Sequence, residues 1–534
     1  VALGIKGAMH PSLLLAPPRA TIPDASHCAT PPRMNFILAL YILAATGLFI
    51  YGTNCYIMVG LFLRRYKTER AKSTALIEAG QVMFDTPESL PHVTTQIPLY
   101  NEANVVERVI RAVVAMDYPA AKHEIQILDD STDETQGIVD ALVSELQAAG
   151  HDIQAVRRTD RVGYKAGALR YGMDRCKGEF LAIFDADFVP PVDFLRKMVP
   201  ALHSESKIAF VQARWGHLNS KQSLLTRAQT IGIDGHFMIE QCARGYNQLF
   251  LNFNGTAGLW RKEAIYDGGN WQDDTLTEDM DLSYRCQLAG WTASYFPDVV
   301  VPAELPDSYT AFKSQQFRWA KGSVQTAIKI MPRVVRSDAS IFAKVQAFLH
   351  MTHYCIHPLM ALMAILALPV LLQTNIILTT WEFAPFAIAI LIAMTGPSAL
   401  YCVSQFSQGR SKGWSLLHLP GLVCIGVGIA LSNTHAVFEA LARVSSPFVR
   451  TPKSGETQTK NYRTKANWLP ALELLMSAYC AFSFTHYLQA EKYLVGPFLL
   501  IYTLGFLIIG SRSLMEQFDL GTRFFTPTPQ PVKV

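Results

Sequence analysis

Long uncharged apolar runs flank a central region of ordinary polarity, and they limit the possible folds of this chain more than any other feature. Residues 35–63 hold about 29 residues without a charge, which exceeds the roughly 20 that a helix needs to cross a bilayer. Four later runs are also long and apolar enough, at residues 347–373, 382–405, 469–488 and 495–512. We therefore expect five membrane-spanning helices.

The charges beside these runs set the expected orientation. Arg64, Arg65 and Lys67 follow the first run, and positive charge prefers the cytoplasmic side, so the central region is expected in the cytosol. Basic residues also flank residues 415–441 on both sides, and Pro420 and several polar residues interrupt this segment. We expect it to lie in the interface or to re-enter rather than to span, with the C-terminus in the cytosol.

The composition narrows the function classes. Only 17% of the residues are charged, against about 25% in a soluble domain, and the deficit lies in the flanks. A net charge of +4 is too small and scattered to indicate nucleic-acid binding. Nine dispersed cysteines without a CxxC pair indicate reduced structural thiols rather than a disulfide framework or a zinc site.

The centre of the chain alternates short apolar segments with amphipathic ones. Residues 93–99, 124–128, 153–156 and 180–184 are predicted strands. Residues 105–116, 135–149 and 166–176 are predicted helices. This alternation is typical of a largely parallel α/β sheet, in which ligands lie beyond the carboxyl ends of the strands.

Two acidic clusters follow predicted strands at that position. Asp185 and Asp187 would point the same way on an extended backbone and could hold a divalent cation together with substrate phosphate oxygens. Asp129 and Asp130 could accept hydrogen bonds from a nucleotide. The alternatives are a solvated loop for the first cluster and helix capping near Ser131 for the second.

Three further segments carry candidate side chains. Lys165 lies between a strand and a helix, where it could pair with phosphate or stand in an ordinary turn. Thr277-Glu278-Asp279 has the pattern of a capped helix start, and Asp279 could also act as a general base. Gln315, Arg318 and Trp319 share one face of a helix, suited to a diphosphate and a sugar ring.

In this order, these motifs resemble the processive membrane glycosyltransferases of glycosyltransferase family 2, the cellulose synthase group, and most of all its cellulose-synthase-like mannan and glucan synthases. The resemblance covers roughly residues 90–470 and rests on segments 96–102, 129–133, 185–187, 277–279 and 315–319. Residues 253–256 are similar to the family's acceptor-side loop, and residues 448–453 to its gating loop. The resemblance implies an α/β GT-A glycosyltransferase domain inserted between transmembrane helices, with amphipathic interfacial helices.

The resemblance also implies roles for individual residues. Asp279, beside Glu278, is the catalytic base. The donor nucleotide and diphosphate are bound by Tyr100, Glu102, Asp130, Lys165, Asp185, Gln315 and Arg318. Asp187, with Asp185, holds Mg²⁺ or Mn²⁺. The acceptor contacts Phe253, Asn254, Gly255, Thr256 and Trp319, while Phe448, Thr451 and Lys453 form the gating loop.

The expected domain order follows from these assignments. It consists of a disordered tail (1–33), a transmembrane helix (34–63), a linker (64–90), the cytosolic GT-A domain (91–310), amphipathic interface helices (311–345), two transmembrane helices (346–414), an interfacial segment with the gating-like loop (415–468), two more transmembrane helices (469–513) and a cytosolic tail (514–534).

The expected function is inverting transfer of a hexose from a nucleoside diphosphate sugar to a growing β-linked glucan or mannan, coupled to translocation of the product. UDP-glucose is the favoured donor and GDP-mannose the alternative. The expected location is a bacterial inner membrane, a plasma membrane or a Golgi-type membrane. The alternatives are an enzyme that adds one or few sugars to a membrane lipid, and a transporter or scaffold whose α/β domain only binds nucleotide.

Overall fold

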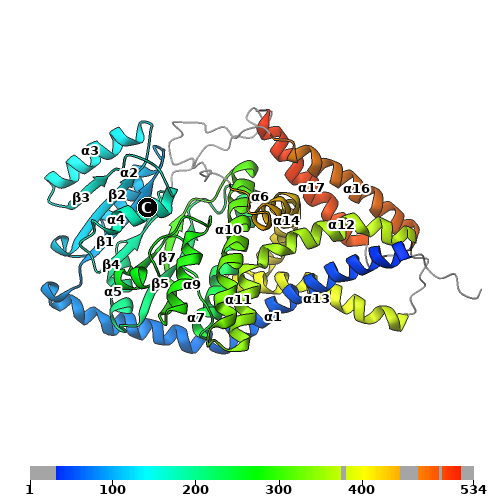
Figure 1. Ribbon diagram of the computed structural model, residues 1–534, viewed down its shortest axis with the longest axis horizontal. Helices are drawn as coiled ribbons and strands as arrows, with labels where there is room; N and C mark the ends of the chain where they lie inside the picture. The colour runs from blue at the N-terminus through cyan, green and yellow to red at the C-terminus, as the bar shows by residue number, and fades with distance from the viewer. Residues whose placement is uncertain (1–31, 374–379, 446–466, 492, 494–495, 519–534) are drawn as a thin grey trace, which may run out of the picture.

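The computed structural model describes residues 32–373, 380–445, 467–491, 493 and 496–518 (Figure 1). A seven-stranded sheet fills one part of the molecule, and long apolar helices fill the other. The strands are β1 (Val93–Leu99), β2 (His123–Asp129), β3 (Asp152–Val156), β4 (Phe180–Ile183), β5 (Ile208–His217), β6 (Gly258–Arg261) and β7 (Thr292–Ala303). The helices around them are α2 (Val106–Val114), α3 (Thr135–Ala148), α4 (Tyr164–Met173), α5 (Phe194–His203), α6 (Leu224–Gly235), α7 (Gln241–Tyr246), α8 (Lys262–Asp267) and α9 (Glu278–Leu288).

The sheet is mixed, with the order β3-β2-β1-β4-β6-β5-β7. β6 runs antiparallel to β4 and β5, and the other neighbouring strands are parallel. The four predicted strands and three predicted helices are confirmed to within a few residues. Because Leu99 pairs with Asp129 at the end of β1 and β2, the residues that follow both strands meet at one edge of the sheet.

Apolar side chains cover both faces of the sheet, as expected for parallel strands. In β4, Phe180 and Ala182 pack into the core shared with α2, α3 and α5, while Leu181 and Ile183 pack into the core on the opposite face. This continuous apolar run explains why β4 is recognisable in the sequence and why its first polar residues appear only at the strand end.

The first helix is longer than its apolar run. α1 (Pro32–Gly80) continues through most of the segment predicted as a linker, and short 3₁₀ turns follow it. Arg65 donates to the backbone carbonyl of Tyr246, and Arg70 pairs with Asp298 of β7 at 2.7 Å. The first part of α1 therefore lies among the apolar helices, and its last part lies along the α/β domain (Figure 1).

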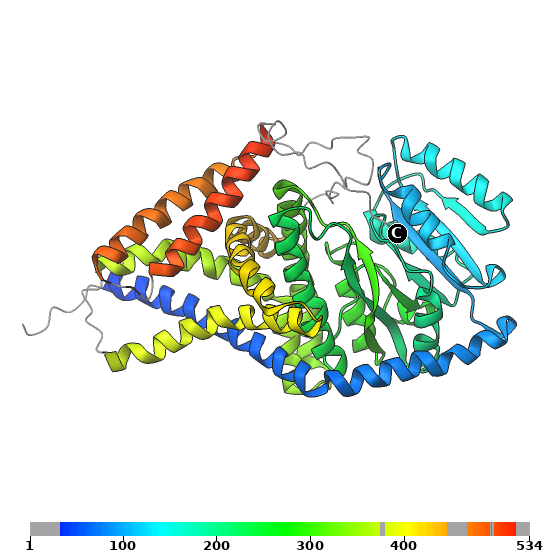
Figure 2. The ribbon, with the colours of Figure 1, turned by 180° about the vertical axis from the view of Figure 1, so that it is seen from behind.

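The remaining helices are α10 (Tyr309–Arg336), α11 (Ile341–Met351), α12 (Ile356–Gln373), α13 (Thr380–Ser407), α14 (Lys412–Gly428), α15 (Ala430–Leu441), α16 (Leu469–Gln489) and α17 (Gly496–Gln517). Both views place the α16–α17 pair at the opposite end of the molecule from β3 (Figure 1, Figure 2). Residues 347–351 belong to α11, so the predicted second span begins only at His353.

Within the described residues, four helices are long and apolar enough to cross a membrane: Phe36–Asp85, His353–Leu372, Ile388–Ser407 and Gly496–Gln517. These correspond to four of the five predicted spans. The fifth, α16, falls short in apolarity because it carries Glu473 and polar residues near its end. The predicted interfacial segment forms α14 and α15, which meet at a bend of 43° and could count as one broken span.

Three polar contacts fix α10 between the sheet and the membrane helices (Figure 1). At its first turn, the backbone N–H groups of Tyr309 and Thr310 donate to the Glu516 carboxylate of α17. One turn on, Lys313 pairs with Glu473 of α16 at 2.6 Å, and both side chains are buried. Lys321 pairs with Glu439 of α15, also at 2.6 Å.

We predict that Glu473→Gln lowers the stability of the protein strongly, by about 3 kcal/mol or more, because it leaves the Lys313 ammonium buried without a counter-charge. The measurement is the thermal unfolding midpoint in detergent. Lys313→Met combined with Glu473→Leu should recover most of the loss. Glu107→Gln, which removes an exposed ion pair with Arg111, is the matched control and should cost under about 0.5 kcal/mol. Equal midpoints for the two single variants would contradict the prediction.

Candidate active site

A cavity of about 220 Å³ opens where β1, β2 and β4 end and where α9 and α10 begin. Most of the residues predicted to bind donor, metal and acceptor line it together. They are Tyr100, Glu102, Asp130, Lys165, Asp185, Asp187, Asn254, Gly255, Glu278, Asp279, Gln315, Arg318 and Trp319. The fold thus brings residues that are as far apart in the sequence as Tyr100 and Trp319 into one cavity.

Two arginines that were not predicted from the sequence, Arg158 and Arg161, lie beside Asp130 and Tyr100 at the cavity. Nε and Nη2 of Arg158 donate to the two carboxylate oxygens of Asp130 at 2.8 and 2.5 Å. The guanidinium of Arg161 lies 3.2 Å from the centre of the Tyr100 ring, a cation–π contact. The only signal in the sequence is the run of basic residues directly after β3, at the same sheet edge as Asp130.

The alternative that residues near Ser131 cap the following helix was wrong. α3 begins only at Thr135, and its backbone N–H is accepted by the Asp133 carboxylate at 3.0 Å. The hydroxyl of Ser131 instead accepts from the backbone N–H of Asn101, which links the loops after β1 and β2.

Asp185 and Asp187 both line the cavity, but not on an extended backbone as expected. The chain turns after β4, and the backbone N–H of Phe188 donates to the carbonyl of Asp185. Lys165 Nζ donates to Asp185 Oδ1 at 2.5 Å and to the Gly255 carbonyl at 2.9 Å. Although burial opposes it, the carboxylates of Asp185, Glu278 and Asp279 raise the pKa of Lys165, so it stays charged.

Asp279 lies in the first turn of α9, where its Oδ1 accepts the backbone N–H of Met280 at 2.8 Å. Burial raises the pKa of Asp279 to about 7; the neighbouring Glu278 adds to the rise and Lys165 opposes it. Thr277 does not cap the helix with its side chain. Its hydroxyl contacts that of Thr326 in α10 at 3.0 Å.

Gly255 is required for this arrangement. Its φ of +80° is a backbone conformation that other residues rarely adopt. A Cβ at this position would lie 3.1 Å from Asp279 Oδ2 and 3.4 Å from Lys165 Nζ, so a side chain would separate the two groups.

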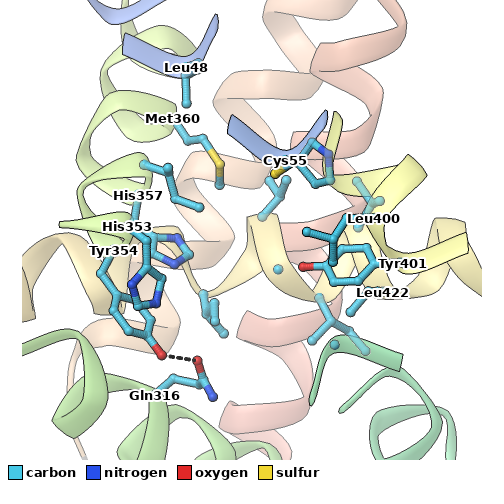
Figure 3. A pocket seen from close by; sticks show the side chains of 18 of the residues that line it. Leu48, Cys55, Gln316, His353, Tyr354, His357, Met360, Leu400, Tyr401 and Leu422 are labelled. Carbon is cyan, nitrogen blue, oxygen red and sulfur yellow. Dashed lines mark hydrogen bonds between the residues drawn. The ribbon is translucent and has the colours of Figure 1, made fainter. Parts of the chain in front are cut away.

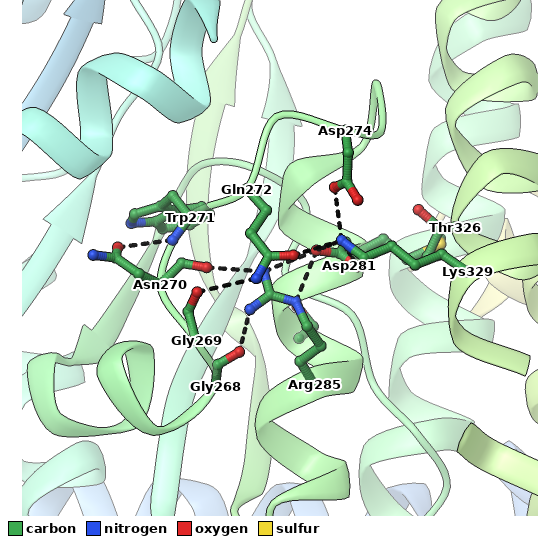
Figure 4. Close-up of polar contacts among 12 residues, drawn as sticks. Gly268, Gly269, Asn270, Trp271, Gln272, Asp274, Asp281, Arg285, Thr326 and Lys329 are labelled. Atoms are coloured by element: carbon green, nitrogen blue, oxygen red, sulfur yellow. Dashed lines mark hydrogen bonds and ion pairs between the residues drawn. The ribbon is translucent and has the colours of Figure 1, made fainter. Parts of the chain in front are cut away.

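A buried ion network holds α9 in place (Figure 4). The Asp281 carboxylate accepts from Arg285 Nε at 2.8 Å and from Lys329 Nζ of α10 at 3.1 Å. Arg285 also donates to the backbone carbonyls of Gly268 and Asn270. Because Asp281 is fully buried and only two residues from Asp279, this network fixes the position of the candidate base relative to α10.

On α10, Gln315, Arg318 and Trp319 face the cavity, as their spacing predicts. Burial lowers the pKa of Arg318 to about 10, opposed by Glu278 and Asp185, so the guanidinium remains charged at neutral pH. The Trp319 ring lies 6.4 Å from that of Trp215 on β5.

A second cavity, of about 550 Å³, continues from Asp279 and Trp319 into the membrane helices. Asn254 and Trp215 line both cavities. Deeper in, Gln316, His353, Tyr354, His357 and Tyr401 point into the space (Figure 3). The Tyr354 hydroxyl donates to Gln316 Oε1 at 3.3 Å. Polar and aromatic side chains thus line a path from the candidate base into the apolar helices.

A histidine and a glutamate beside this path were also missed. Nε2 of His236 contacts the Asn254 amide at 3.0 Å, and its Nδ1 contacts Glu240 Oε2 at 2.8 Å. Both residues belong to a π-helical turn, His236–Glu240, and such turns are frequent at functional sites. Only their i, i+4 spacing is visible in the sequence.

Two predicted acceptor residues within the described part of the chain, Phe253 and Thr256, line neither cavity. Phe253 is fully buried against Phe210 and Trp260, so it supports the loop rather than touching an acceptor. Thr256 is also buried, and its hydroxyl accepts the backbone N–H of Asp185 at 2.9 Å. The gating-loop residues Phe448, Thr451 and Lys453 lie outside the described residues.

Residues 91–322 match the family model described as "Glycosyltransferase like family 2". The chain is 33% identical over 504 residues to Glucomannan 4-beta-mannosyltransferase 7 of Arabidopsis thaliana, covering 90% of this chain and 86% of that protein. It is 36% identical over 402 residues to Probable glucomannan 4-beta-mannosyltransferase 10 of the same plant, covering 72% of each. The chain belongs to glycosyltransferase family 2.

Membership in glycosyltransferase family 2 confirms the family that the sequence motifs indicate. It also confirms that the chain is an enzyme rather than a transporter or scaffold. The mixed seven-stranded sheet is GT-A-like, as predicted. Among solved structures, mannosyltransferase PcManGT from Pyrobaculum calidifontis, in complex with GDP-Man and Mn²⁺, aligns with a TM-score of 0.45 and 20% identity, covering 73% of this chain and 99% of that one. The several long apolar helices agree with a multi-pass membrane protein.

We predict that Asp281→Ala lowers both stability and glycosyltransferase activity, because Arg285 and Lys329 lose their buried counter-charge. The free energy of unfolding should fall by about 3 kcal/mol, which a lower thermal unfolding midpoint would report. The activity is measured as the rate at which nucleoside diphosphate is released from the sugar donor, and this rate should fall. Asp274→Asn is the matched control, since it removes only the exposed partner of the same Lys329. If both variants behave alike, the network does not hold α9.

Proposed function

We propose that this glycosyltransferase builds a β-linked mannan or glucomannan from GDP-mannose. The continuity of the two cavities supports this most directly, since a polymer that starts at Asp279 and Trp319 has a path among the membrane helices. The names of the Arabidopsis relatives support a mannosyl donor. They shift the preferred donor from UDP-glucose to GDP-mannose, the alternative that the sequence left open.

In this proposal, Asp279 removes the proton from the acceptor hydroxyl as that oxygen attacks the anomeric carbon. A raised pKa suits a base that works near neutral pH. One base acting opposite the leaving diphosphate inverts the anomeric centre, which yields the β-linkage from an α-linked donor. Trp319 and Asn254 would contact the acceptor at the junction of the cavities, and Gly255 would contact it from the first cavity.

The cations of the cavity would bind the leaving diphosphate. Arg318 offers a planar guanidinium and Lys165 an ammonium, both on the cavity wall. Gln315 would add an amide donor. On the nucleotide side, Asp130 is held by Arg158, and Tyr100 carries Arg161 on its ring. We assign the base and ribose to that side, together with Glu102.

Asp187 and Asp185 would hold Mg²⁺ or Mn²⁺. The described residues contain no group of three or more His, Cys, Asp or Glu side chains able to hold a metal ion by themselves. Two carboxylates fit an ion that takes its remaining ligands from a diphosphate and water, so metal binding should depend on the donor. Such an ion supplies positive charge that stabilises the leaving diphosphate.

The orientation in the membrane follows the positive-inside rule. Arg64 and Arg65 follow the first apolar run, and this supports an α/β domain on the cytosolic side, where nucleotide sugars are available. The chain would be a multi-pass protein of a plasma membrane or Golgi-type membrane.

A donor screen tests the substrate. Purified full-length protein incubated with GDP-mannose or UDP-glucose should release GDP from the first and form an organic-insoluble β-linked polymer. Release of UDP alone would contradict the mannosyl donor. A product that remains organic-soluble and carries one or few sugars would contradict the polymerase and favour a lipid acceptor.

The pH dependence tests the base. Because Asp279 acts only when deprotonated and its pKa is about 7, kcat/KM should fall as the pH drops below that value. Asp279→Asn should lose at least about a hundredfold in kcat. Asp273→Asn, on the exposed loop before α9, is the control and should keep the wild-type profile. A wild-type profile that stays flat through pH 7 would exclude Asp279 as the titrating base.

A further inference from the structure

A third cavity, of about 290 Å³, lies away from the active site, between the loop before α6 and the first turns of α14. Its walls include Lys221 and Arg227 from the α6 side, and Arg410, Trp414 and His418 from the α14 side. None of the residues that line the other two cavities lines this one. It is therefore a separate site that the glycosyl transfer does not use.

The cavity is strongly positive. Among the described residues, every ionisable side chain in its wall is basic and none is a carboxylate. Within the part of the chain that the structure describes, Lys221 and Arg227 form no ion pair. Arg410 comes no closer than 4.0 Å to the carboxylate of Asp234, which also accepts from Gln405 and contacts His217. The positive charges of Lys221, Arg227 and Arg410 are therefore only weakly compensated by the described residues, and these side chains can bind an anionic ligand.

The surroundings of the cavity are those of a membrane surface. The candidate span Ile388–Ser407 ends three residues before Arg410. Two exposed leucines, Leu416 and Leu417, extend from α14 with 56% and 76% of their surface accessible. The Trp414 ring lies 5.1 Å from the Arg410 guanidinium and stacks on His418 at 4.5 Å. Tryptophan is enriched where a bilayer meets water.

We propose that this cavity, the basic cavity of Lys221, Arg227 and Arg410, binds the phosphate of an anionic phospholipid in the leaflet that faces the α/β domain. The arginines bind the phosphate oxygens, Trp414 lies beside the glycerol region, and Leu416 and Leu417 enter the acyl chains. A bound lipid would tie α6, which packs on α14 beside the second cavity, to the bilayer surface. The inference does not depend on the identity of the sugar donor.

The test measures lipid binding by the full-length protein in a neutral detergent. Short-chain phosphatidylserine and phosphatidylcholine are titrated separately, and bound lipids are counted by native mass spectrometry. The wild type should retain one phosphatidylserine that the variant Arg227→Gln/Arg410→Gln does not. The apparent affinity should fall about fivefold for each cation removed. Phosphatidylcholine binding should be the same in all proteins.

Arg333→Gln/Arg336→Gln is the matched control, because it removes two exposed arginines from the last turn of α10, outside the cavity. It should bind phosphatidylserine like the wild type. Lys221→Gln, at an exposed position, repeats the test if the double variant does not fold, and it should show the single fivefold loss. Unchanged phosphatidylserine binding in these cavity variants would overturn the proposal. Displacement of the lipid by inorganic phosphate at equal concentration would also overturn it, since the site would then serve a free anion.

Discussion

The density of carboxylates in the first cavity is the constraint on which the site depends. Asp130, Asp185, Asp187, Glu278 and Asp279 all line a space of about 220 Å³, where like charges repel strongly. The fold answers with cations at fixed distances, because Arg158 holds Asp130 and Lys165 holds Asp185. Burial raises the pKa of Asp279 to about 7, and the neighbouring carboxylate of Glu278 adds to the rise while Lys165 opposes it. Burial and an incompletely compensated charge together therefore give this carboxyl the pKa of a neutral-pH base.

The helix α10 joins this cavity to the membrane helices. Its Gln315, Arg318 and Trp319 close one wall of the cavity, and Lys329 further along holds Asp281 of α9. The same helix is bound to α15, α16 and α17 by buried ion pairs and by the Glu516 cap. Because α10 contacts both the site and the membrane helices, a shift of those helices would move the cavity wall that carries Gln315, Arg318 and Trp319.

Much of this arrangement could be predicted from the sequence, for a physical reason. A strand buried on both faces can have a continuous apolar run, as β4 does, so the first acidic residue after that run, Asp185, marks the carboxyl end of the strand. The sequence could not show which side chains form ion pairs between different strands, helices and loops. The contact of Arg158 with Asp130 and that of Lys165 with Asp185 depend on strand order and turn geometry. The length of α1 was missed because its polar half is stabilised by contacts with the α/β domain rather than by an apolar pattern.

The two cavities meet at the candidate base, and this junction constrains how a polymer can grow. Asp279, Asn254 and Trp319 line both spaces. In the proposed function, the donor and the acceptor chain therefore approach these residues from opposite sides. Several charged groups line the first cavity, whereas mostly apolar and aromatic side chains line the second, with neutral polar ones such as Gln316 among them. In the proposed function, the uncharged sugar chain occupies the second cavity and the nucleoside diphosphate occupies the first. In the same proposal, the new terminal hydroxyl returns to Asp279 after each transfer only if the chain moves deeper among the membrane helices. The position of one carboxylate at the junction of the two cavities would then couple elongation to movement toward the membrane.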